Sequence, residues 1–151
     1  MSRSIDGSMV LWENQLVSAW RKEASKRLPE LQRIIASRDV DGPMMFWIEL
    51  HSKFTGLCEE TPVQVDLLKR IWEYAVWCMA QGGDVGTAAA YGFCEHLIQT
   101  RKSRAVLPRL MSRRDLEAIK GLLLYHSTQE DFEKALKCFD EEGKPTRKPR
   151  R

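Results

Sequence analysis

The feature that most constrains the fold is an apolar pattern of helical period that runs along almost the whole chain. It is clearest between Thr61 and Gly82, where seven apolar side chains recur at helical spacing: Val65, Leu68, Ile71, Trp72, Ala75, Val76 and Met79. No segment shows the alternation of apolar and polar residues that is typical of a half-buried strand. The pattern therefore predicts an all-α fold.

Proline, glycine and capping residues divide this pattern into about seven short helices. We expect them at 9–27, 29–37, 43–56, 62–81, 85–100, 113–125 and 128–142. Because they are short and joined by tight turns, an irregular bundle of antiparallel helices is favoured. Helical-hairpin packing of a repeat-like kind is the alternative that the pattern leaves open.

Local signals support several of these boundaries. Thr61-Pro62 is typical of an N-cap followed by proline at the first helical position. Ser112 to Asp115 and Ser127 to Glu130 have the spacing of capping boxes. Residues 101–109, which contain Pro108, are predicted to form a loop or short turn. The helix at 85–100 is rich in glycine and alanine, so we expect it to lie centrally, close to its neighbours.

Length and charge predict one domain with two segments outside it. A chain of 151 residues is sufficient for a single core, here placed at 9–142, and we expect 1–8 and 143–151 to be disordered. The net charge of +3 comes from six basic residues in 101–114 and five in 144–151, whereas the rest is slightly acidic. No apolar run approaches the ~20 residues of a membrane span. Without a signal-peptide core at the N-terminus, we expect a cytoplasmic protein.

Recognisable catalytic and cofactor motifs are missing from the sequence. It contains no GxSxG, P-loop, GxGxxG, HExxH or CxxC pattern. The four cysteines stand among apolar residues, which favours reduced and mostly buried thiols. No cofactor is therefore predicted, and an enzyme is not favoured.

A few residues nevertheless suggest a binding surface. Trp77 lies near the end of a helix that is apolar on several sides, as in a helix covered by a partner. Glu49, Glu95 and His96 would form a metal site if separate helices brought them together. Glu95 and His96 are adjacent, however, which puts them on different faces of a regular helix, so capping or interhelical hydrogen bonding is the plainer interpretation. The candidate surface residues are Trp77, Glu49, Glu95, His96, Arg101 and Arg104.

Several short strings resemble an uncharacterised family of small bacterial all-helical proteins, a domain of unknown function. They are FWIEL at 46–50, IWEYA at 71–75, TA at 87–88 before FCEHL at 93–97, and LP at 107–108 before LMS at 110–112. The resemblance covers roughly residues 44–140, with Cys94 where the family pattern has Tyr. It implies an all-helical fold and a bacterial cytosolic setting but no activity. Some members look like small partner proteins of toxin systems.

These observations lead to three hypotheses of function. The first is a non-enzymatic protein-interaction module, of inhibitor or immunity type, that binds another protein or a second copy of itself. The second is a nucleic-acid-associated protein that uses the basic segment 101–114 and the tail. The third is a metal-dependent enzyme with a Glu/His site between helices. No membrane partner is expected.

Overall fold

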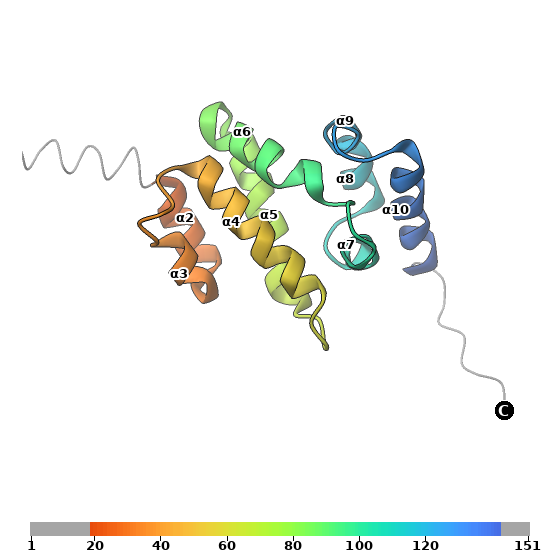
Figure 1. Cartoon of the computed structure of the whole chain (residues 1–151), viewed down its shortest axis with the longest axis horizontal. Helices are drawn as coiled ribbons and strands as arrows, with labels where there is room; N and C mark the ends of the chain where they lie inside the picture. Colours follow the sequence, from red (N-terminus) through yellow and green to blue (C-terminus); the bar gives the residue numbers. More distant parts are fainter. Residues whose placement is uncertain (1–18, 143–151) are drawn as a thin grey trace, which may run out of the picture.

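The computed structural model describes residues 19–142, and in this range all regular structure is helical (Figure 1). The α-helices are α2 (Ala19–Arg27), α3 (Gln32–Ile35), α4 (Pro43–Cys58), α5 (Val65–Gln81), α6 (Gly83–Gly92), α7 (Arg101–Val106), α8 (Arg113–Ala118), α9 (Lys120–Leu123) and α10 (Gln129–Glu142). Three short 3-10 helices join some of them: η1 (Pro29–Leu31), η2 (Cys94–His96) and η3 (Leu107–Arg109). The predicted all-α fold is confirmed for this part of the chain.

The number of helices differs from the expectation. Residues 19–142 form nine α-helices rather than about seven. Residues 101–109, predicted as a loop or short turn, form α7 and η3 instead. The Thr100 side chain accepts a hydrogen bond from the backbone N–H of Ser103 and caps α7. The helix expected at 113–125 is divided into α8 and α9 at Ile119, whose φ of −104° and ψ of 16° depart from helical geometry.

Capping signals were more accurate at some helix ends than at others. The Ser112–Asp115 capping box is confirmed at the start of α8. The box at α10 is formed one residue later than predicted, between Thr128 and Asp131, each side chain bonding the other's backbone N–H. The helix expected from Pro62 begins at Val65, after a turn. The predictions for 1–18 and 143–151 lie outside the described residues.

The helices are arranged in three groups along the long axis of the molecule (Figure 1). α2 and α3 lie at one end, α4, α5 and α6 in the middle, and α7 to α10 at the other end. α6 packs against both α4 and α5, as its small residues predicted. Among the described residues, no helix is both long and apolar enough to cross a bilayer.

Glycine makes this close packing of α6 possible. A Cβ added at Gly92 would lie 2.9 Å from Cβ of Trp47 and 3.3 Å from Sδ of Met44, both on α4. A Cβ at Gly86 would lie 3.2 Å from the Met79 carbonyl oxygen of α5. Gly82 and Gly83, with φ of 71° and 58°, form the turn that reverses the chain between α5 and α6.

Aromatic side chains fill the core between these helices. The Trp47 ring stacks on Tyr74 of α5 with centroids 5.4 Å apart and lies 4.9 Å from the Phe93 ring. Tyr74 is fully buried, and its hydroxyl donates a 2.6 Å hydrogen bond to the Trp20 carbonyl of α2. Tyr74 therefore contributes its ring to the core, while its buried hydroxyl is satisfied by the Trp20 carbonyl.

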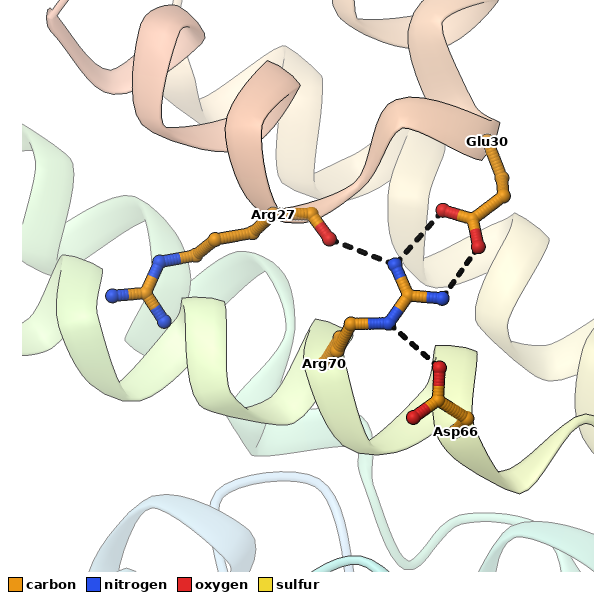
Figure 2. Close-up of polar contacts among 4 residues, drawn as sticks. All are labelled: Arg27, Glu30, Asp66 and Arg70. Carbon is orange, nitrogen blue, oxygen red and sulfur yellow. Dashed lines mark hydrogen bonds and ion pairs between the residues drawn. The ribbon is translucent and has the colours of Figure 1, made fainter.

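One arginine ties the first group of helices to α5. Figure 2 shows Arg70 donating to both carboxylate oxygens of Glu30, to the Arg27 carbonyl at the end of α2, and to Asp66. The two bonds to Glu30 measure 2.8 and 2.5 Å, the fork geometry of a bidentate pair. Arg70 lowers the pKa of Glu30 from its usual 4.5 to about 2.

Replacing Gly92 with Ala should destabilise the protein. The added methyl group is held by the backbone and would overlap Trp47, so we expect a loss of about 1–3 kcal/mol. Gly121→Ala is the matched control, because nothing lies within 4 Å of its Cβ position in α9. Urea denaturation should show this control to be neutral or stabilising; equal effects of the two changes would contradict the packing.

The Glu30–Arg70 pair should make stability depend on pH. Because the folded-state pKa of Glu30 is depressed, its contribution is present above pH 4.5 and is lost as the pH falls toward 2. The Glu30 side chain is 48% exposed, so we expect only about 0.5–1 kcal/mol. The free energy of unfolding of wild type and Glu30→Gln should converge across that range. A difference that does not change with pH would rule out this linkage.

Candidate functional site

A break in the predicted helix at 85–100 creates the candidate site. α6 ends at Gly92, Phe93 leaves helical geometry with φ −132° and ψ −61°, and the chain continues as η2. Phe93 thereby buries its ring between Trp47 and Phe54, with centroids 4.9 and 5.0 Å away. The expectation of one continuous helix over 85–100 is therefore wrong. The sequence does not reveal the break, because Phe93 and Leu97 keep the four-residue apolar spacing of a straight helix.

Three side chains converge beyond this break: Glu95, His96 and His126. Glu95 is only 5% exposed, and its Oε1 lies 2.9 Å from Nε2 of His126. The His96 ring stacks on the His126 ring, with centroids 4.7 Å apart and planes inclined by 22°. One potential ligand atom from each of the three side chains lies within 4.8 Å of the others. We call these residues the Glu95–His96–His126 cluster.

Buried neighbours hold the cluster in place. Cys94 and Leu97, on either side of the Glu95–His96 pair, are fully or almost fully buried. His126 lies in the turn between α9 and α10, after the buried Leu123, whose carbonyl accepts a bond from the His126 backbone N–H. α9 also packs against η2. Both parts of the cluster thus rest on the packed core.

A third histidine lies beside the cluster on α4. The His51 ring centroid is 5.1 Å from that of His96, and the side chain is half-buried. Burial lowers the pKa of His51, and the neighbouring His96 lowers it further. The three histidines of the chain therefore lie in one row, from α4 across η2 to the turn before α10.

Glu49 is separated from this row. It is exposed on α4 and lines a cavity of about 210 Å³ with residues of α3 and the loop that follows, including Arg33 and Asp39. Of the three residues that the sequence suggested as a composite site, the structure brings together Glu95 and His96, and His126 joins them in place of Glu49.

The other suggested surface residues have varied environments. Trp77 is half-buried and stacks on Tyr74 with centroids 5.9 Å apart, so it contributes to the packing of α5. Arg104 is half-buried and donates a 2.8 Å bond to the Ile98 carbonyl. Arg101 is exposed at the start of α7. Of these three residues, Arg101 alone is exposed.

Three of the four cysteines are buried in the core. All four are free thiols, and Cys58, Cys78 and Cys94 are buried, as expected. Burial raises the pKa of the Cys94 thiol to about 12, so it is protonated at neutral pH. The Cys94 thiol donates a weak hydrogen bond to Sδ of Met79, with the two sulfurs 3.8 Å apart. Cys94 therefore packs as a small hydrophobic side chain despite its proximity to His96.

An exposed apolar surface lies next to the cluster. The rings of Tyr91, at the end of α6, and Tyr125, the residue before His126, meet edge to face with centroids 6.4 Å apart. They are 45% and 70% exposed, and Leu124 beside them is 37% exposed. We call Tyr91, Leu124 and Tyr125 the Tyr91–Tyr125 surface. Sequence reasoning missed it because its halves come from separate parts of the chain.

His126 should be needed to stabilise the buried Glu95 carboxylate. In metal-free protein, His126→Ala leaves that carboxylate without its 2.9 Å partner, and we expect a loss of about 1–3 kcal/mol. His96→Ala keeps the pair and should cost less. Adding Glu95→Gln to His126→Ala should recover part of the loss, because a neutral amide is cheaper to bury. Chemical denaturation with a chelator present measures all four proteins; equal losses for the two histidine variants would contradict the pairing.

Comparison with protein-family models, curated proteins and solved structures yields no match to this chain. The resemblance carried by the strings at 46–50, 71–75 and 93–97 therefore stays a prediction.

Proposed function

We propose that the chain is a non-enzymatic protein-interaction module of the bacterial cytosol and that the Tyr91–Tyr125 surface contacts its partner. The observation that supports this most is the exposure of two tyrosine rings packed against each other. Tyrosine is enriched at the energetic centres of protein interfaces, because its rigid ring buries a large area at low entropic cost.

The surroundings of the two rings support the same proposal. Met44 and Ile48 are exposed one turn apart on α4, and Sδ of Met44 lies against Gly92, the residue after Tyr91. Exposed apolar patches are typical of interaction sites. A partner with apolar side chains would remove these groups from water.

The basic segment favours a nucleic-acid partner less strongly than its sequence suggested. Arg104 is engaged with the Ile98 carbonyl, and Arg113 pairs with Glu117 and Asp140. These internal contacts reduce the positive charge that the segment offers to phosphates. We therefore favour a protein partner, and the family resemblance suggests an inhibitor or immunity-type role for the interaction.

Photo-crosslinking in cells tests this surface. The photoreactive amino acid p-benzoylphenylalanine at position 125 of the full chain should give an adduct of defined mass. The same residue at position 133, on an exposed part of α10, should give none. With the probe at position 124, Tyr125→Glu should reduce the adduct at least fivefold, because it puts a charge into an apolar contact.

The masses of the adducts identify the partner. An adduct of twice the mass of the chain would mean that a second copy of the chain occupies the surface. The protein would then still be an interaction module, but its partner would be itself in a homodimer. Equal labelling from positions 125 and 133 would contradict the proposal. So would the lack of any adduct from a chain that is monomeric by light scattering.

A further inference from the structure

We infer that the Glu95–His96–His126 cluster is a binding site for a single Zn²⁺ ion. This inference goes beyond the proposed interaction surface and does not depend on it. Its basis is the convergence of three potential ligand atoms, all within 4.8 Å of one another, from two parts of the chain.

The donor types favour zinc over the hard divalent cations. The cluster offers one carboxylate oxygen and two imidazole nitrogens. Zn²⁺ binds this mixture in tetrahedral sites, and three protein ligands leave its fourth position for water or another donor. Mg²⁺ and Ca²⁺ prefer sets made of oxygen atoms alone. The three buried thiols of the chain lie outside the group, so the site is of the nitrogen–oxygen type.

The spacing of the ligand atoms allows a zinc ion to be held after small side-chain adjustments. A tetrahedral Zn²⁺ with bonds of about 2.0–2.1 Å has its ligand atoms roughly 3.3 Å apart. The Glu95–His126 pair is already slightly closer than this, at 2.9 Å, and the widest separation is 4.8 Å or less. Rotation of the imidazole of His96 or His126 supplies movement of this size, while Glu95 stays fixed.

The surroundings provide both rigidity and access. Glu95, with its side chain 7% exposed, forms the inner wall of the site, whereas His126, 46% exposed, borders solvent. An ion entering from solvent meets His126 first and is then held by the buried carboxylate. Ligands supported by packed neighbours lose little freedom on binding, which favours affinity.

The adjacent residues Glu95 and His96 both contact His126, one through a 2.9 Å carboxylate–imidazole pair and the other through ring stacking. Successive side chains point about 100° apart on an α-helix and about 120° apart on a 3-10 turn, so Glu95 and His96 meet only because both reach His126. In the structure they belong to η2, a single 3-10 turn that begins directly after the change of direction at Phe93. The turn holds both side chains against His126, and its position is fixed by burial of Phe93 and Leu97.

His96 distinguishes a metal site from an internal hydrogen bond. The Glu95–His126 pair by itself satisfies a buried carboxylate and requires no ion. His96 is not part of that pair but supplies the third ligand atom. If the cluster is a zinc site, removal of His96 must weaken Zn²⁺ binding while the pair persists.

Titration of the full chain with Zn²⁺ tests the inference. Protein purified without a metal-affinity tag is stripped with a chelator, and binding is then measured by calorimetry and by competition with a chromophoric chelator. We expect one Zn²⁺ per chain. His96→Ala and Glu95→Gln should each lower the affinity more than about tenfold, since even loss of an outer-shell partner costs 10- to 100-fold.

Two controls make the result specific. His51→Ala removes the neighbouring half-buried histidine and should leave Zn²⁺ affinity within about twofold of wild type. Cys138→Ser removes the thiol that is not buried and should also have no effect. Co²⁺ in the wild-type site should give the intense visible absorption of a four-coordinate ion, and His96→Ala should abolish it.

Three outcomes of these titrations would contradict a zinc site at the cluster. Absence of stoichiometric Zn²⁺ binding by wild type would overturn the inference. Zn²⁺ affinity unchanged by His96→Ala would overturn it too, and would leave Glu95 and His126 as an internal pair. An equal loss in His51→Ala and His96→Ala would contradict the three-residue ligand set. None of these outcomes bears on crosslinking from position 125, so the two proposals can fail separately.

Discussion

The close packing of α6 against α4 and α5 organises the helices around one aromatic core. Gly92 lies where any larger residue would overlap Trp47, and Gly86 lies where it would crowd the backbone of α5. This approach lets Trp47, Tyr74 and Phe93 share one aromatic core. Because Phe93 must enter that core, the chain changes direction there, and Glu95 and His96 are carried toward the last helices.

Polar contacts stabilise this arrangement at both ends. Arg70 joins α5 to η1 and to the end of α2, and Tyr74 hydrogen-bonds the α2 backbone. At the other end, Arg104 bonds the carbonyl of Ile98, and Glu95 pairs with His126. Arg104 and Glu95, which the sequence suggests as surface residues, therefore make polar contacts inside the protein. Short helices leave many backbone carbonyls unpaired at their ends, and charged side chains nearby can donate hydrogen bonds to them.

The cluster and the Tyr91–Tyr125 surface lie beside each other because their residues are close in the sequence. Tyr125 precedes His126, and Tyr91 lies at the end of α6, four residues before Glu95. An ion at the cluster would connect η2 to the turn before α10, the two segments next to the exposed rings. The physical link between the two proposals is thus the turn that contains Leu124, Tyr125 and His126.

The helical class, the central position of α6 and the Ser112–Asp115 cap could be predicted from the amino-acid sequence. Periodicity, residue size and capping are local properties, so they can be recognised without the tertiary structure. Tertiary structure alone decided the break after Gly92, since the apolar spacing at Phe93 and Leu97 is the same in a straight helix. It also decided that Glu95 and His96 meet His126 rather than Glu49. Those contacts join residues about thirty positions apart, and only the packing of the core brings them together.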